Sequence, residues 1–239
     1  MKRQNIRKLL LIISMLLFPI TIYYLSPYVI IMGAMEGIIN GSFIVFMTML
    51  LGGIFFGRIF CAYLCPAGGI MECTALINNN NPKQGRRNYI KYVIWSLWVI
   101  GVIVSFLYRK KEITVNFFYL TDHGISIANI YGYVIYYGII LLFFLPSILM
   151  GKRAMCHYIC WMAPFMILGS KLGQLLHIRQ LRLISEKEGC TQCHACDRKC
   201  PMGLKVSEKV QTGKMYDTEC ILCGECIDTC PKKVIKYKM

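Results

Sequence analysis

Two copies of one cysteine pattern near the C-terminus constrain the fold of this 239-residue chain more than any other feature. Each copy has the spacing C-x2-C-x2-C-x3-C-P, and the second copy begins thirty residues after the first. Two intervening residues let consecutive sulfurs point into one concave loop, as a cubane iron–sulfur cluster requires, and the fourth cysteine of each copy then serves the other cluster. The spacing predicts two [4Fe-4S] clusters. The predicted ligand sets are Cys190, Cys193, Cys196 and Cys230 for the first cluster, and Cys220, Cys223, Cys226 and Cys200 for the second.

Three other interpretations of this pattern are weaker. A structural zinc site also uses C-x2-C pairs, but it gives no reason for the third step or for the duplicated C-x3-C-P ending. Residues 190–194 match the haem-attachment pattern C-x-x-C-H, but a haem would remove two thiols from a complete set, so we place His194 in a loop or on the surface. Disulfides would not persist if this tail faces a reducing compartment.

The remainder of the chain is too apolar for a soluble domain. Hydrophobic residues make up 56% of the chain and charged residues 16%, whereas soluble domains carry about 25% charged residues. Four stretches with few or no charges are long enough, with some flanking residues, to cross a bilayer. They are residues 9–25, 37–57, 92–108 and 124–151. The first resembles a signal peptide but lacks a small-residue cleavage site, so we expect a retained anchor.

The distribution of basic residues predicts the orientation in the membrane. Lys and Arg number four before the first stretch, five from Arg58 to Lys91 and fifteen from Lys152 onward, against none in 26–43 and three in 109–111. Because Lys and Arg accumulate on the cytoplasmic side, we expect a multi-pass protein of the inner membrane with both termini and the tail in the cytoplasm. The same asymmetry explains the net charge of +15 without nucleic-acid binding.

These patterns predict a mainly α protein with three parts. Residues 1–171 are expected to form a four-helix transmembrane bundle with short interfacial helices. Apolar residues recur at near-helical spacing from Leu172 to Ile184 with basic residues between them, so we expect an amphipathic linker helix over 172–189. Residues 190–239 are expected to form a small α+β two-cluster domain.

The membrane half contains a second internal repeat. Residues 57–65 and 151–160 share a glycine, a basic residue, a C-x3-C step and a tyrosine two places after the first cysteine. Residues four apart share a face of a helix, so each pair would present two sulfurs together. Four such thiolates could hold a metal, an iron–sulfur centre or a redox-active disulfide; alternatively, the cysteines simply pack as small apolar residues. The four cysteines are Cys61, Cys65, Cys156 and Cys160. Cys73 has no counterpart in the other repeat, so we expect it to pack in the interior.

Two resemblances extend this interpretation. The tail resembles bacterial two-cluster ferredoxins, most closely from Glu219 to Pro231. With its C-x3-C motifs, nearly the whole chain resembles the membrane iron–sulfur proteins related to the quinol dehydrogenase subunit of periplasmic nitrate reductase systems. The first motif matches that family at Cys65-Pro66, whereas Trp161 replaces the proline of the second. The resemblance implies quinone as the membrane-side partner.

The predicted function is electron transfer between the cytoplasmic clusters and a membrane-side acceptor or donor, either quinone or a partner subunit. No catalytic residue is assigned, and no glycine fingerprint for a flavin or nicotinamide is present, so the chain would depend on a redox partner protein. The alternative is a metal-handling or cofactor-assembly reductase acting on a copper, iron or corrinoid centre. A redox-sensing transporter is weaker, because the predicted spans contain almost no ionisable residues. For His157 we favour contact with lipid headgroups over binding of quinone or metal.

Overall fold

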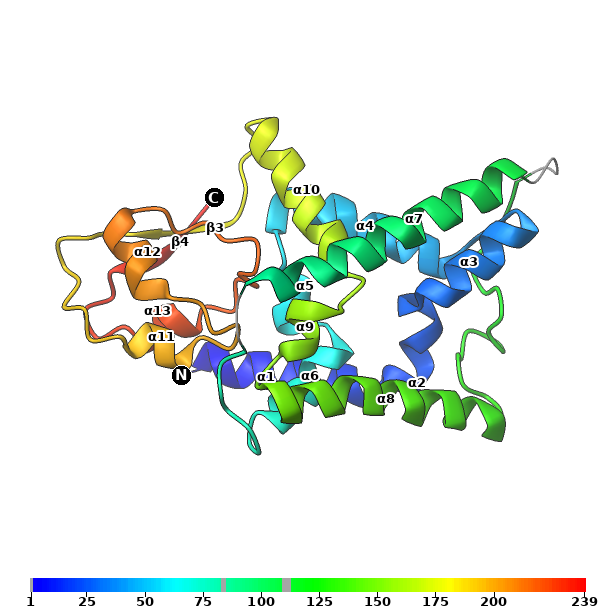
Figure 1. Cartoon of the computed structure of the whole chain (residues 1–239), viewed down its shortest axis with the longest axis horizontal. Coiled ribbons are helices and arrows are strands. Elements are labelled where there is room, and N and C mark those ends of the chain that lie inside the picture. The colour runs from blue at the N-terminus through cyan, green and yellow to red at the C-terminus, as the bar shows by residue number, and fades with distance from the viewer. Residues whose placement is uncertain (1, 83–84, 109–112) are drawn as a thin grey trace.

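The computed structural model describes residues 2–82, 85–108 and 113–239. Figure 1 shows long helices extending to the right and a smaller unit, which contains the cysteine-rich tail, on the left. The N-terminus lies beside that unit. The basic residues 109–111, which entered the charge count, lie outside the described residues.

The first apolar stretch forms a bent helical segment. It comprises α1 (Lys2–Leu16), α2 (Phe18–Thr21) and the 3-10 helix η1 (Ile22–Leu25), with a bend of 61° between α1 and the rest. Pro19 lies in the first turn of α2, where its missing N–H is tolerated but where it cannot continue the hydrogen bonding of α1. α3 (Pro27–Glu36) follows and ends at Gly37, which has the left-handed backbone that glycine allows at a helix terminus.

The membrane half contains two repeats of a long helix, a short helix and a third helix. The first repeat is α4 (Gly41–Phe56), α5 (Ile59–Tyr63) and α6 (Pro66–Thr74), and the second is α8 (Ile130–Met150), α9 (Ala154–Tyr158) and α10 (Ala163–Leu175). Each long helix ends at a glycine with positive φ, Gly57 at 56° and Gly151 at 106°. α10 packs against α4, and α6 packs against α8. The third helix of each repeat therefore lies against the long helix of the other.

Glycines allow α4 and α10 to approach closely. A Cβ atom added at Gly53 would lie 2.8 Å from the carbonyl oxygen of Met166, and one at Gly169 would clash with that of Leu50. One turn along, Phe165 of α10 makes an edge contact with Phe46 of α4, with ring centroids 5.1 Å apart. Small residues at a helix crossing and aromatic rings beside it are typical of packing inside a membrane, where no hydrophobic effect draws helices together.

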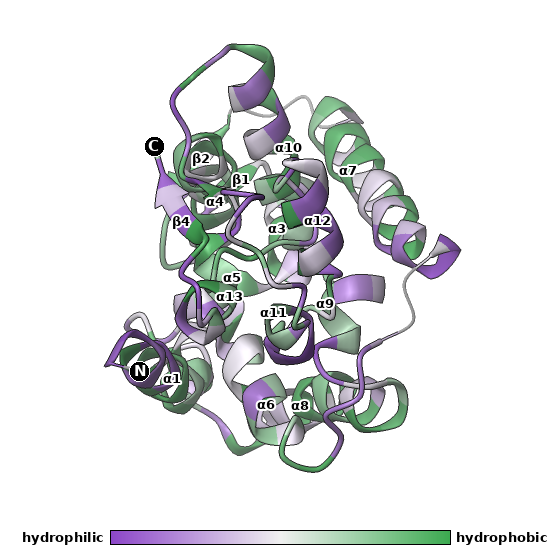
Figure 2. Cartoon of the chain, turned by 90° about the vertical axis from the view of Figure 1, so that its left-hand side faces the viewer, coloured by the Kyte–Doolittle hydropathy of each residue, from purple (hydrophilic) through white to green (hydrophobic). Residues whose placement is uncertain are grey.

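The structure supports two or three membrane spans by length and composition. Among the described residues, the helix over 86–108, which contains η2 (Arg86–Tyr89) and α7 (Ile90–Tyr108), and α8 are long and apolar enough to cross a bilayer. The bent α1–η1 segment makes a third span if it counts as one, and α4 is a shorter apolar helix. Figure 2 shows α7 and α8 in the green of hydrophobic residues along most of their lengths. The membrane-protein prediction is thus confirmed, but the four-span bundle is not.

A short parallel strand pair joins two segments at the end of the molecule farthest from the tail. β1 (Ile38–Asn40) precedes α4, β2 (Thr114–Asn116) follows α7, and Ile38 pairs with Thr114. The Asn40 side chain accepts a hydrogen bond from the backbone N–H of Phe43 at 2.9 Å and so caps α4. The sequence analysis did not predict these strands.

The tail forms a small α+β unit. Its strands β3 (Arg182–Ser185) and β4 (Ile235–Lys238) pair in antiparallel fashion, and the helices between them are α11 (Ala195–Lys199), α12 (Val206–Thr212) and α13 (Glu225–Thr229). Val210, Ile221 and Ile235 are buried in its core. The predicted two-cluster fold class agrees with this architecture.

The helix expected over 172–189 is not formed beyond Leu175. α10 ends there, and β3 begins at Arg182. The side-chain amide of Gln180 donates to the carbonyl oxygens of Ile54 and Ser170, at 2.6 and 2.9 Å, which holds the turning chain against α4 and α10. Apolar spacing alone did not reveal that the residues after this turn pair with the C-terminal strand.

Replacing Gly169 with alanine tests the α4–α10 crossing. The added methyl group would meet the Leu50 carbonyl oxygen, which cannot yield unless the helices separate, so we expect a loss of about 1–3 kcal/mol in the free energy of unfolding. Thermal unfolding of the detergent-solubilised full chain measures it. Gly52→Ala is the matched control, because a Cβ there meets nothing within 4 Å. Equal losses in both variants would contradict this packing.

Candidate functional site

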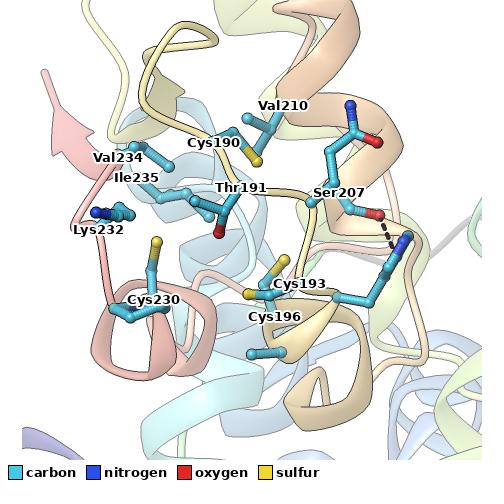
Figure 3. A pocket seen from close by; sticks show the side chains of 14 residues that line it. Cys190, Thr191, Cys193, Cys196, Ser207, Val210, Cys230, Lys232, Val234 and Ile235 are labelled. Atoms are coloured by element: carbon cyan, nitrogen blue, oxygen red, sulfur yellow. Dashed lines mark hydrogen bonds between the residues drawn. The ribbon is translucent and has the colours of Figure 1, made fainter.

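Four cysteines from both copies of the tail pattern line one pocket. Figure 3 shows this pocket, which lies between the loop before α11, the end of α13 and the start of β4. Its cysteines are Cys190, Cys193, Cys196 and Cys230. We call them the outer set, because Cys193 is exposed and the other three are half-buried.

A polar network fixes the loop of the outer set. Asp197 accepts hydrogen bonds from the backbone N–H of Ser207 at 2.7 Å and from its hydroxyl at 2.5 Å. His194 Nδ1 lies 2.9 Å from the same carboxylate. Burial alone would raise the pKa of Asp197, but the bonds from Ser207 and His194 outweigh it and lower that pKa. His194 is therefore a loop residue, as predicted, that ties the loop to α12.

A second pocket is lined by the other four tail cysteines. They are Cys200, Cys220, Cys223 and Cys226. We call them the inner set, because all but Cys220 are buried. Each pocket thus contains three cysteines of one copy and the fourth cysteine of the other.

The tail is fastened to the membrane half next to the inner set. The Arg3 guanidinium pairs with Asp228 at 2.6 Å, and the Gln4 amide donates to the carbonyl oxygen of Cys223 at 3.1 Å. The first turn of α1 and the tail therefore lie on the same side of the molecule (Figure 1). Arg58, which precedes the first cysteine pair, reaches the tail as well.

The central contact between the halves is Glu219, which precedes Cys220. Its carboxylate pairs with Arg58 at 3.1 Å and with Lys91, and His157 Nδ1 lies 3.6 Å away. The Arg58 and Lys91 side chains are 2% and 0% exposed. Burial alone would raise the pKa of Glu219, but the two cations outweigh it and lower that pKa.

The structure corrects our interpretation of His157. This side chain is fully buried, and its Nε2 lies 3.0 Å from the carbonyl oxygen of Met202, in the tail. Burial lowers the pKa of His157 to about 4, so the imidazole is neutral at pH 7. The lipid-headgroup interpretation is wrong because the tail covers this position.

The twin cysteine pairs are buried inside the membrane half and have the same local geometry. The N–H groups of Cys61 and Cys156 donate to the carbonyl oxygens of Arg58 and Arg153, each at 3.0 Å. Each pair spans a turn between two helices, because α5 and α9 end before the second cysteine. The expectation that each pair lies on one helix face is therefore wrong. Trp161 stands where the first turn has a proline, yet the second turn has the same backbone hydrogen bonds as the first.

Each first cysteine of a pair contacts a methionine of the opposite repeat. Cys61 Sγ lies 4.0 Å from Met166 Sδ, and Cys156 Sγ lies 3.7 Å from Met71 Sδ. Sequence analysis missed both methionines, although both cysteines and both methionines are 95 residues apart. The structure thus brings sulfur atoms of the two repeats together.

In 2–82, 85–108 and 113–239, no three His, Cys, Asp or Glu side chains are arranged to hold a single metal ion. Cys73, near the end of α6, is exposed, so its assignment to interior packing is wrong.

Comparison with known proteins agrees with these features. The family described as "4Fe-4S dicluster domain" matches residues 189–235, and the family described as "4Fe-4S binding domain" matches twice, at 41–83 and 132–179. This chain is a relative of ferredoxin-type membrane electron-transport proteins. No solved structure matches it.

Three relatives illustrate the similarity. It is 27% identical to the uncharacterized protein MJ0750 of Methanocaldococcus jannaschii, over 81% of this chain and 75% of that protein. It is 24% identical to the ferredoxin-type protein NapH of Haemophilus influenzae, over 84% and 67%. It is 25% identical to the methylamine utilization ferredoxin-type protein MauN of Paracoccus denitrificans, over 84% and 68%. The predicted resemblance is confirmed, and these relatives support an electron-transfer role.

Replacing Glu219 with glutamine tests the contact between tail and membrane half. The variant leaves two buried cations without a counter-charge, so we expect a loss of about 3–5 kcal/mol in the stability of the docked tail. Limited proteolysis of the connection over 176–181 would measure it as faster cleavage. Glu186→Gln is the matched control, because Glu186 forms an exposed pair with Lys236 at 2.9 Å, worth about 0–1 kcal/mol. Equal cleavage rates in both variants would contradict the role of Glu219.

Proposed function

We propose that this chain is a membrane-bound electron-transfer subunit that relays electrons between two [4Fe-4S] clusters in its tail and a membrane-side acceptor or donor. The observation that carries this proposal is the placement of the two cysteine sets. The outer set reaches the surface, and the inner set lies where the tail meets the membrane half. Such an order would connect a soluble redox partner with the lipid-embedded half.

The pocket linings support the crosswise ligand sets. Cys230 of the second copy completes the outer set, and Cys200 of the first copy completes the inner set. A cubane cluster needs four thiolates around one space, and the chain brings four cysteines to each pocket. When bound, the clusters supply one-electron transfer, and the chain's residues hold them, shield the inner one and present the outer one.

We propose four spans with both termini and the tail on the cytoplasmic side of the inner membrane. The pairing of Arg3 with Asp228 supports a common side for the N-terminus and the tail. The pairing of β1 with β2 supports a common opposite side for the segments before α4 and after α7. Chain ends on one side and connecting segments on the other are what alternating spans would produce.

A cleft beside the inner set offers a place for the membrane-side partner. Its volume is about 990 Å³, and its lining includes Arg58, Gln174, Arg182 and Cys220. That volume is at the upper end of the range of cofactor sites. We propose that a quinone head group or a partner subunit occupies it, since quinone is what the family resemblance implies.

The second candidate function is metal handling, in which the clusters would supply electrons to reduce a bound copper, iron or corrinoid centre. The contacts of Cys61 with Met166 and of Cys156 with Met71 favour keeping it. Thiolate and thioether sulfur together are the ligands that monovalent copper prefers.

The test is metal analysis of the anaerobically purified full chain in detergent. We expect about eight iron atoms in the tail clusters, with two cubane signals. Cys223→Ser should remove about half of that iron and the inner signal, whereas Cys73→Ser should leave both. Material without iron would overturn the relay.

A double variant, Cys61→Ser with Cys156→Ser, separates the two functions. Under the relay we expect slower reduction or oxidation of a quinone analogue with the tail clusters intact. Under metal handling we expect the loss of stoichiometric copper. Unchanged electron delivery together with unchanged metal content would exclude a shared site at the twin pairs.

A further inference from the structure

We propose that the twin cysteine pairs hold a metal–thiolate centre that is dianionic, and that two buried groups with an excess of positive charge, each built around an arginine of one repeat, are its counter-charge. The inference rests on the proposed function, which places a redox or metal site at these pairs. It adds the charge of the centre and the residues that balance it.

The first positive group contains Arg58, Lys91 and Glu219. Two cations share one carboxylate, and all three side chains are at least 92% buried. Transfer of a proton from Lys91 to Glu219 would leave the sum unchanged, at one positive charge. His157, 3.6 Å from Glu219, adds no negative charge.

The second positive group contains Arg7, Arg153 and Glu72. Glu72 Oε1 accepts from Arg7 Nη1 at 2.7 Å and from Arg153 Nη2 at 2.9 Å. The two guanidinium groups are 2% and 1% exposed. This group also carries one positive charge in excess, and a buried charge without a counter-charge is unfavourable.

Both arginines face the cysteines. The Arg58 guanidinium lies within electrostatic range of Cys61, Cys156 and Cys160. Arg153 lies within range of Cys156 and also of Cys223 in the inner set. Arg153 Nη1 also donates to the carbonyl oxygen of Cys61 at 3.0 Å. Arg58 and Arg153 are 95 residues apart, as are Cys61 and Cys156, so each repeat contributes one arginine.

Several donors of these arginines lack a protein acceptor. Nε and Nη2 of Arg58 and Nε of Arg153 are buried and have no hydrogen-bond partner among the residues that the structure describes. Buried donors normally find an acceptor. Sulfur atoms of an anionic centre between the two arginines would accept from them, whereas an uncharged disulfide would offer these donors no negative charge.

A single divalent ion would give the same charge, but no three described His, Cys, Asp or Glu side chains are arranged to hold one. Two polynuclear compositions then satisfy this charge. Four thiolates carry four negative charges, and an oxidised iron–sulfur core or two monovalent copper ions each carry about two positive charges. Met71 and Met166 distinguish them, because thioethers bind copper and are not needed by a four-cysteine cluster. The Cys–Met sulfur distances of 3.7 and 4.0 Å resemble the spacing of about 3.8 Å between two sulfurs on one tetrahedral ion with bonds of about 2.3 Å.

The experiment compares metal, acid-labile sulfide and redox titrations in the anaerobically purified full chain. We expect metal beyond the tail's share of about eight iron atoms, and its loss in Cys61→Ser with Cys156→Ser. If this metal is iron with sulfide, Met71→Leu with Met166→Leu should retain it. If it is copper, the same variant should bind copper at least tenfold more weakly in a chelator competition.

Charge variants test the counter-charge. Arg58→Gln and Arg153→Gln should each shift the midpoint potential of an iron centre to more negative values, or weaken copper binding, because the anionic centre loses a cation. Arg58→Lys and Arg153→Lys keep the charge. In these variants the midpoint potential or the copper affinity should stay close to that of the unsubstituted protein. Arg86→Gln, at an exposed arginine before α7, is the matched control and should change nothing.

The outcomes separate this inference from the proposed function. Complete tail clusters without further metal would overturn the inference and leave the relay intact. Further metal whose potential and affinity are the same in both glutamine variants would also overturn it. A tail without iron would overturn the proposed function itself. If a glutamine variant does not fold, the lysine variant of the same position still reports whether the charge is what the centre needs.

Discussion

The structure depends on one buried carboxylate that joins its two halves. Glu219 lies directly before a cysteine of the inner set and pairs with Arg58, directly after the glycine that ends α4, and with Lys91 at the start of α7. Removing such ions from water is costly unless all of them are paired. Any other arrangement of the two halves that buried these ions unpaired would therefore be less stable. The contact fixes where the inner set lies relative to the twin pairs, and so sets the path that electrons would take between the tail and the membrane half.

The membrane half obtains its interior from the exchange of helices between two repeats. α10 packs on α4 and α6 packs on α8, so neither repeat can bury its own apolar face alone. The exchange also brings Met166 to Cys61 and Met71 to Cys156. The same packing that stabilises the bundle therefore creates a sulfur-lined interior with a guanidinium from each repeat beside it.

Sequence reasoning was strongest where covalent spacing determines geometry. The tail spacing predicted which four cysteines would share each pocket, because sulfur positions follow from the number of intervening residues. It failed for the segment after Leu175, since the near-helical spacing of its leucines could not reveal that β4 would pair with β3. It also failed for His157 and the two methionines, whose surroundings come from distant segments and leave no local signal. The repeat at an offset of 95 residues was the one clue that could have revealed Met71 and Met166.

The position of Glu219 has a consequence for biogenesis. Its three neighbours come from the first repeat, from α7 and from the second repeat, and these segments are synthesised one after another. The set of side chains that binds this carboxylate is complete only when all three segments have reached their final positions. Docking of the tail, which is synthesised after all three, therefore requires that they are already in place, and a chain with a misplaced helix would leave the tail without its central ion pairs.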